Sequence, residues 1–281
     1  SGFGRRGNAG MNKEVGMAVD MIVCVKQVMD PETPASAFQI DTDVNRVREA
    51  PGIPPVVNGF DENAVEAALK IKDAQGGTIT VLSVGSNFVM DVMKKPLSMG
   101  ADGLVLAQDE AFDDLDSFAT ARVLTEAIRK IGRFDMVICG RQASDWDNAQ
   151  VPLGIAELLG LPCLTMAQNV EVVDSGVVVQ RVLSDGYEVV EADLPALVTV
   201  SNELGEPRYA TLRGIMAAGR KTPTVWSAAD LGIDGPALEP RLKITGLDVP
   251  VTDRSCEFIE GEDEADSGRL LALRLREAGL I

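Results

Sequence analysis

The stretch from Cys139 to Pro152 combines a glycine with closely spaced carboxylate, amide and guanidinium side chains. It follows an apolar run, 134–138, with the composition of a β-strand, and precedes a run, 154–159, with the composition of a helix. In open α/β sheets, ligands bind where a strand ends and a helix begins, and the unpaired N–H groups of a helix start suit a phosphate. The stretch therefore predicts a site for a phosphate-containing ligand.

The residues of this stretch allow more than one interpretation. In a ligand site, Gly140 would let the backbone approach the ligand closely. The donors and acceptors would then come from Gln142, Asp145, Asp147, Asn148 and Gln150. The stretch could instead be a solvated loop, with Asp147 or Asn148 capping the following helix. Asp145 and Asp147 could also form a metal site or a general acid–base pair, but no further ligands accompany them.

The composition excludes several classes of protein. The formal net charge of −17 argues against nucleic acid or an anionic membrane as a partner. There is no histidine, which removes Ser-His-Asp and Cys-His catalysis and histidine-based metal sites. No apolar run approaches the roughly 20 residues that span a bilayer. Three of the four cysteines lie in apolar surroundings typical of reduced core residues. We therefore expect a cytoplasmic protein.

The order of the predicted elements indicates an α/β protein with a Rossmann-type, doubly wound and mostly parallel sheet. Apolar runs predict strands at 21–25, 78–84, 103–107 and 134–138. Helices are predicted between them at 61–75 and 115–131. Asp61 is expected to cap the first of these helices. Pro96 should kink or end a helix over 87–99.

The predicted domain covers 21–231; two regions flank it, and two smaller β features lie within it. Residues 1–20 are expected to be a disordered leader, and Met11, Met17 or Met21 could be the native first residue. A small antiparallel β addition is predicted from runs at 170–173, 177–183 and 187–192, followed by a core strand at 196–200. A short hairpin is predicted at 38–47. The tail, 232–281, is predicted to hold a strand at 256–259 and a helix at 265–278, and to pack on another protein.

Residues 140–151, Gly-Arg-Gln-Ala-x-Asp-x-Asp-x-x-Gln-Val, resemble the nucleotide-binding segment of the electron transfer flavoprotein beta subunit family. Three other stretches resemble the family and occur in its order. They are Cys-Val-Lys-Gln-Val at 24–28, Asn-Gly-Phe-Asp-Glu at 58–62 and Glu-Pro-Arg-Tyr-Ala-Thr-Leu at 206–212. Each motif is short, but four of them in one order make the resemblance specific, and it covers about 21–231.

The resemblance implies a subunit that pairs with an alpha subunit holding the redox-active FAD. Such a heterodimer carries electrons from dehydrogenases, such as an acyl-CoA dehydrogenase, to an acceptor. In many members the beta subunit holds an AMP, and in electron-bifurcating members a second FAD takes its place and NADH docks nearby. The nucleotide contacts implied by position are Cys24, Asn58, Gly59, Phe60, Asp61, Val84, Gly140, Arg141, Gln142, Ala143, Ser144, Asp145, Trp146, Asp147, Asn148, Ala149, Gln150 and Val151.

The resemblance also implies a partner-recognition loop at 208–217. Its implied contacts are Arg208, Tyr209, Leu212, Ile215 and Met216, with Leu212 as the apolar anchor. The tail, 232–281, would pack on the alpha subunit. Three departures from the family bear on these sites: Gly59 stands where proline is common, Trp146 replaces a small or acidic residue, and Arg213-Gly214 replaces Pro-Asn.

Two other classes of protein compete with an electron-carrying subunit. One is an adenine-nucleotide enzyme on the same fold, for which a Gly-x-x-x-x-Gly-Lys-Ser/Thr loop would be expected, and the sequence contains none. The other is an interaction subunit that has lost its nucleotide. ATP hydrolysis by the isolated chain would favour the first of these alternatives.

Overall fold

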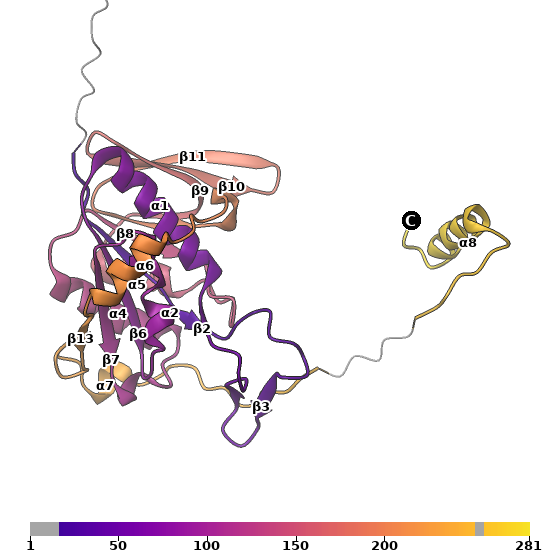
Figure 1. Ribbon diagram of the computed structural model, residues 1–281, viewed down its shortest axis with the longest axis horizontal. Coiled ribbons are helices and arrows are strands. Elements are labelled where there is room, and N and C mark those ends of the chain that lie inside the picture. The colour runs from indigo at the N-terminus through magenta and orange to yellow at the C-terminus, as the bar shows by residue number, and fades with distance from the viewer. Residues whose placement is uncertain (1–16, 251–255) are drawn as a thin grey trace, which may run out of the picture.

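The computed structural model describes residues 17–250 and 256–281 (Figure 1). Its centre is a nine-stranded sheet. From one edge to the other the strands are β11 (Gly186–Asp193), β10 (Gly176–Leu183), β9 (Cys163–Val173), β12 (Ala196–Val200), β8 (Met136–Gly140), β1 (Met21–Cys24), β6 (Ile79–Gly85), β7 (Gly103–Gln108) and β13 (Thr224–Trp226). From β9 to β13 neighbouring strands are parallel, while β10 and β11 are antiparallel additions. The predicted fold class is therefore confirmed.

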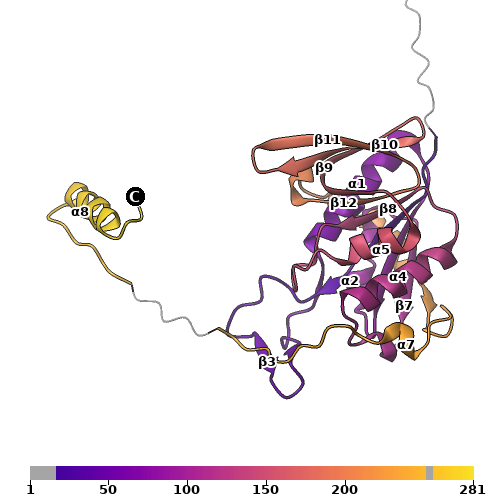
Figure 2. The same ribbon diagram turned by 180° about the vertical axis from the view of Figure 1, so that it is seen from behind.

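Helices cover both faces of the sheet. One face carries α1 (Gly59–Gln75), α2 (Met90–Met93), α3 (Lys95–Met99) and α6 (Leu212–Arg220). The other carries α4 (Ser117–Ile131), α5 (Val151–Leu159) and α7 (Gly235–Leu238), which are in front in Figure 2. Side chains alternate along the strands, so Met21 and Val23 of β1 face α1, while Ile22 and Cys24 face α4.

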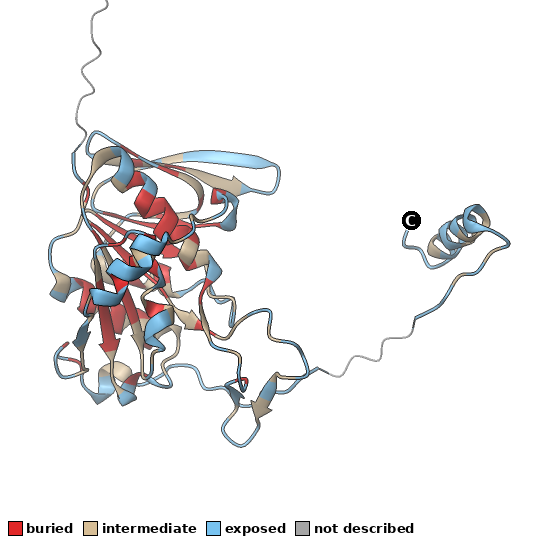
Figure 3. Cartoon of the chain, viewed as in Figure 1, coloured by how far each residue is buried: buried red, intermediate tan, exposed pale blue. Residues whose placement is uncertain are grey.

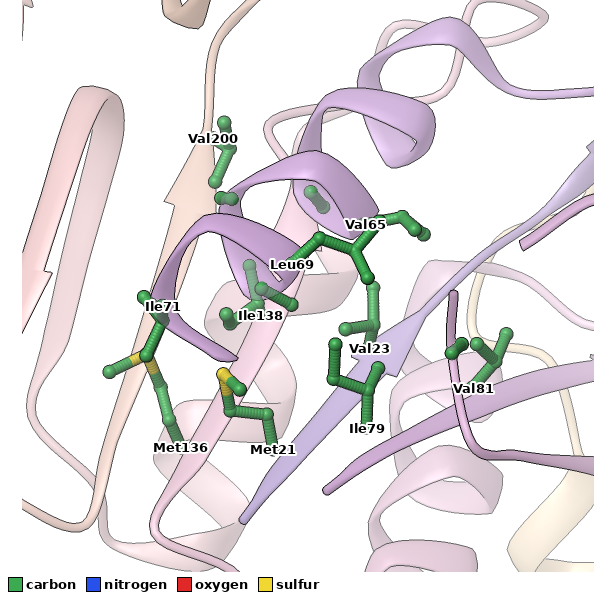
Figure 4. Close-up of a cluster of buried hydrophobic side chains, with 14 of the residues drawn as sticks. Met21, Val23, Val65, Leu69, Ile71, Ile79, Val81, Met136, Ile138 and Val200 are labelled. Atoms are coloured by element: carbon green, nitrogen blue, oxygen red, sulfur yellow. The ribbon is translucent and has the colours of Figure 1, made fainter. Parts of the chain in front are cut away.

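The core consists of aliphatic side chains pressed between α1 and the parallel strands. Figure 4 shows Val65 and Leu69 of α1 lying over Met21, Val23 and Ile79. Figure 3 shows the burial concentrated in these strands and in α1, while β11 is largely exposed. This rigid layer places the ends of β1, β6 and β8 at one edge of the sheet, where the site is found.

Several shorter elements lie outside the central sheet. β2 (Gln27–Val28) pairs with β5 (Val56–Val57), and β3 (Gln39–Asp41) pairs with β4 (Arg46–Arg48), which confirms the predicted hairpin at 38–47. Two 3-10 turns, η1 (Glu110–Phe112) and η2 (Asn202–Leu204), follow strand ends. The last helix, α8 (Glu264–Glu277), is drawn apart from the domain in Figure 1 and buries none of its residues.

Several predictions about single elements have definite outcomes. Pro96 does interrupt its helix, because α2 and α3 meet at Lys94 and the proline is the second residue of α3. The predicted strand at 256–259 is wrong: these residues are not in a strand, since β structure requires a paired neighbour and none is assigned to them. β13 was not predicted, because a three-residue strand is too short to show a period.

The assignment of 1–20 to a disordered leader falls mostly on residues 1–16, which lie outside the described residues, as does Met11. Val19 and Asp20 belong to the domain. Val19 is fully buried, and the backbone N–H of Asp20 donates to Asp135 Oδ2 at 2.8 Å. In the two described segments of the chain, no helix has both the length and the apolar character needed to cross a bilayer.

Candidate functional site

Asn58 joins the start of α1 to the loop that follows β8. Its side chain is fully buried, and its Nδ2 donates to the carbonyl oxygen of Gln142 at 2.8 Å while its Oδ1 accepts from the N–H of Ser144 at 3.1 Å. Its own N–H donates to the carbonyl oxygen of Lys26 at 2.9 Å. Through its side chain and its backbone, Asn58 thus joins three stretches, 24–28, 58–62 and 140–151, that are far apart in the sequence, and we call this arrangement the Asn58 clamp.

Asp61 lies in the first turn of α1 and points inward, so the expectation that it caps the helix is wrong. The helix begins at Gly59 after Asn58, and Asp61 accepts from the N–H of Lys26 at 2.7 Å and from the N–H of Gly140 at 3.2 Å. Burial raises the pKa of Asp61 to about 7 despite these two hydrogen bonds, which favour the charged form. A carboxyl group that changes charge near neutrality therefore lies beneath the candidate ligand loop.

The raised pKa of Asp61 predicts a pH dependence of stability. In the unfolded chain the carboxyl group ionises near pH 3.9. Below that pH the group is protonated in both the folded and the unfolded state, so its raised pKa does not lower the free energy of unfolding. Between about pH 4 and 7 only the unfolded chain loses the proton, so the free energy of unfolding should fall by about 1.4 kcal/mol per pH unit. Urea unfolding of the wild type and of Asp61→Asn measures this. The free energy of unfolding of the wild type minus that of the variant should decline from about pH 4 to 7 and then level off. A difference that stays constant with pH would contradict the raised pKa.

Gly140 is needed for the packing of α1 against β8, a role that the sequence did not predict. A Cβ atom built there would lie 2.4 Å from Asp61 Oδ1 and 2.7 Å from the carbonyl carbon of Phe60. The space above Gly140 is thus filled by the first turn of α1. The glycine lets α1 come close enough to β8 for its N–H to reach Asp61.

Two buried polar atoms of the loop after β8 have no partner among the described residues: Arg141 Nε and Ser144 Oγ. The Arg141 guanidinium lies over the Phe60 ring, 4.8 Å from the ring centroid, and its backbone N–H donates to the carbonyl oxygen of Val200 at 2.9 Å. Buried polar atoms are normally paired, so two unpaired ones in one loop are consistent with a ligand that would pair them. This observation supports the expected role of the loop.

The loop ends in a turn that leads into α5. Asp147 and Ala149 adopt left-handed backbone angles, with φ values of 49° and 53°. Gln142 Nε2 donates to Asp147 Oδ1 at 2.7 Å, and the helix begins at Val151 after Gln150, with no side-chain cap. The alternative in which Asp147 or Asn148 caps α5 is therefore wrong, and the first N–H groups of the helix are left without a side-chain acceptor.

The remaining predicted contacts surround this loop unevenly. Lys26 Nζ lies 2.6 Å from Asp145 Oδ2, an ion pair that the sequence analysis missed because a lysine after a strand is usually solvated. Cys24 lies beside Cys139 in the neighbouring strand, and this contact together with burial raises the pKa of the Cys139 thiol. Trp146 is about half exposed.

A hollow of about 380 Å³ adjoins the loop on the side of η2. It is lined by Pro31, Asn58, Gly59, Phe60, Glu62, Asn63, Ser144, Asn202, Gly205, Glu206 and Pro207. Of the predicted contacts, it brings together Asn58, Gly59, Phe60 and Ser144. Pro31 and Asn202 carry no motif, so sequence reasoning could not have found them.

The predicted recognition loop is mostly a helix. Thr211 Oγ1 accepts from the N–H of Gly214 at 3.0 Å and so caps α6. Tyr209 is 93% exposed and Leu212 is 75% exposed, and Ile215 and Met216 are also exposed, on the same face of α6 as Leu212. A Cβ atom at Gly214 would lie 2.2 Å from the carbonyl oxygen of Ser98, so glycine there lets α6 lie close to α3. We name these four residues (Tyr209, Leu212, Ile215 and Met216) the apolar patch.

Comparisons with known proteins identify the family of the chain. A family model described as the electron transfer flavoprotein domain matches residues 52–231. The electron transfer flavoprotein subunit beta of Thermoanaerobacterium thermosaccharolyticum is 37% identical over 86% of this chain and 93% of that protein. The same subunit of Megasphaera elsdenii is 40% identical over 77% and 81%, respectively. The chain belongs to the electron transfer flavoprotein beta subunit family.

Relatives with other names occur in the same family. The caffeyl-CoA reductase-Etf complex subunit CarD of Acetobacterium woodii is 39% identical over 76% of this chain and 80% of that protein. The family is one of flavoproteins that act in electron transfer, and the names of its members describe subunits of larger assemblies. The matched range, 52–231, contains the Asn58 clamp, the loop after β8 and the apolar patch.

Proposed function

We propose that this chain is the beta subunit of a heterodimeric electron transfer flavoprotein and is not an enzyme by itself. With an alpha subunit that holds FAD, it carries electrons from a flavin dehydrogenase, such as an acyl-CoA dehydrogenase, to an acceptor. The observation that carries the proposal is the Asn58 clamp, which joins 24–28 and 58–62 to the loop after β8, where two buried polar atoms have no partner among the described residues. A cytoplasmic location is part of the proposal.

The ligand of this chain is proposed to be AMP, with a structural role. The uncapped start of α5 and the hydroxyl of Ser144 would hold its phosphate, because N–H and O–H donors suit an anion. Residues 58–61, Cys24 and Val84 would surround the rest of the nucleotide, and Trp146 would cover it. AMP brings no redox chemistry, so these residues bind and orient it and stabilise the loop.

A second FAD in place of AMP is the alternative, and the hollow beside Ser144 favours it. This space of about 380 Å³ lies next to the loop and offers room beyond a mononucleotide. In that case NADH would dock nearby, and the heterodimer would bifurcate electrons.

Two partner surfaces are proposed, the apolar patch and the tail. The apolar patch suits a dehydrogenase, because exposed apolar side chains on one helix face mark protein contacts. The tail suits the alpha subunit, since Phe258, Leu271 and Leu280 are all exposed. The root of the tail is fixed to the domain, where Asp116 Oδ2 accepts from the N–H groups of Arg241 at 2.6 Å and Leu242 at 2.9 Å.

The composition of the complex purified after coexpression with the alpha subunit tests the proposal. A one-to-one complex with bound FAD and an adenine nucleotide is the expected result. A stable homodimer that ignores the alpha subunit would contradict it, and ATP hydrolysis by the chain alone would favour an enzyme of the same fold.

A further inference from the structure

Four polar side chains form a row along one face of α1. They are Asn63, Glu66, Lys70 and Asp73. The spacing of three and four residues places them one above another on the helix surface. All four contact the segment 204–208, which leads from η2 to the apolar patch. The helix that starts at the candidate nucleotide site therefore also holds the approach to the docking surface.

Glu66 makes the most complete contact in this row. Its Oε2 accepts from the Arg208 Nε at 2.8 Å and from the Arg208 backbone N–H at 3.1 Å, and its Oε1 accepts from the Arg208 Nη2 at 3.1 Å. The Glu66 side chain is only 7% exposed. Arg208 also reaches Asp73, at 2.9 Å, but that carboxylate is 62% exposed. The guanidinium is therefore held by one buried and one solvated carboxylate.

The other contacts of the row fix the backbone just before Arg208. Asn63 Nδ2 donates to the carbonyl oxygen of Gly205 at 2.7 Å, and Lys70 Nζ donates to that of Leu204 at 3.4 Å. The far end of α6 is held separately, because Lys221 Nζ donates to the carbonyl oxygen of Ala101 at 2.8 Å. Between these two anchors α6 lies against α3, where Gly214 is close to the carbonyl oxygen of Ser98, while Tyr209, Leu212, Ile215 and Met216 remain exposed.

A buried carboxylate is costly unless it is fully paired, and hydrophobic residues would often stabilise the same position better. Glu66 therefore makes little sense as a source of stability alone. Its three hydrogen bonds set both the backbone and the side chain of Arg208, and they turn the guanidinium toward α1. The next residue, Tyr209, then points into solvent and is 93% exposed.

We propose that Glu66 is a positioning residue for docking, acting through Arg208 to present the apolar patch in one orientation. The family resemblance placed Arg208 among the partner contacts. Here Arg208 instead contacts Glu66 within the subunit and so helps to fix the position of the apolar patch. This inference rests on the proposed docking function of the patch. If the patch has the binding orientation in only a fraction of the molecules, the apparent Kd for the partner equals the intrinsic Kd divided by that fraction.

The test uses the coexpressed heterodimer as electron acceptor of an acyl-CoA dehydrogenase. Glu66→Gln keeps the shape of the side chain but loses its charge and one acceptor. We expect the apparent KM for the heterodimer to rise roughly three- to tenfold, with kcat and flavin content unchanged. Asp73→Asn is the matched control: it removes the exposed carboxylate of the same guanidinium and should change KM less than about twofold.

A double variant distinguishes an effect of Glu66 through the apolar patch from an unrelated loss of affinity for the partner. If Glu66 acts through the patch, Glu66→Gln should add little to the KM of Leu212→Ala, because both changes disable one interaction. Arg208→Lys, which keeps the charge but loses the two-pronged contact, should raise KM as Glu66→Gln does and serves if the latter folds poorly. A normal KM for both folded variants, with a raised KM for Leu212→Ala, would overturn the inference. A normal KM for Leu212→Ala would instead overturn the docking proposal.

Discussion

Gly140→Ala should destabilise the domain by about 3 kcal/mol or more and abolish nucleotide retention. Extra atoms in a packed interior usually cost about 1–3 kcal/mol, and more where the neighbours cannot move. Here the new methyl would meet Asp61 Oδ1 at 2.4 Å, the Phe60 carbonyl carbon at 2.7 Å and Phe60 Cβ at 2.8 Å. These atoms belong to the first turn of α1, so relief would require the helix to move away from β8 and break the Gly140–Asp61 hydrogen bond.

Urea unfolding and nucleotide content of the purified heterodimer measure this effect. Gly103→Ala is the matched control, because it also lies in a parallel strand, while the nearest atom to its Cβ position is Thr80 Oγ1 at 3.9 Å. It should change the free energy of unfolding by less than about 1 kcal/mol. If the two alanine variants were equally stable and both kept the nucleotide, the close contact of α1 with β8 would be wrong.

Leu212→Ala should weaken docking to the dehydrogenase while leaving the fold intact. The side chain is 75% exposed in this chain, so the folded subunit loses little when it is truncated. Burying one leucine at an interface contributes about 1.5–3 kcal/mol, which corresponds to a roughly ten- to hundredfold rise in the apparent KM for the heterodimer. The melting temperature and flavin content should stay near the wild-type values.

Alanine variants of two other leucines are the controls for this result. Leu153 of α5 is about half exposed but lies outside the apolar patch, so Leu153→Ala should leave KM unchanged. Leu69 of α1 is buried in the core, so Leu69→Ala should lose about 2–5 kcal/mol of stability. A lowered melting temperature for Leu212→Ala with normal KM would place that leucine in the core and remove the docking surface.

The parallel sheet was predictable because buried strands leave a strong local signal. Runs such as 21–25 and 104–107 are apolar at consecutive positions, as expected for strands covered on both faces. The hairpin of β10 and β11 was marked by glycine turns. β13 escaped because its three residues are partly exposed and pair only at the edge of the sheet.

The contacts within the site could not be derived from local patterns. A carboxylate three residues into a helix usually acts as a cap or faces solvent, and nothing around Asp61 indicates that Gly140 leaves room for it to turn inward. Likewise, Arg208 carries no sign that its partner is Glu66, since this contact depends on how α1 crosses the sheet. The family resemblance pointed to the right segments, but the side-chain roles required the packed structure.

The nucleotide content of the purified heterodimer tests the central claim most directly. The complex should be coexpressed, purified without added nucleotide and denatured with acid, and the released cofactors should be identified and counted by mass spectrometry. The account predicts about one FAD and about one AMP per heterodimer, the latter held by the loop that Asn58 clamps. Two FAD would contradict AMP as the ligand and support the bifurcating alternative. A fully folded complex with no adenine nucleotide beyond the FAD of the alpha subunit would contradict the proposed site itself.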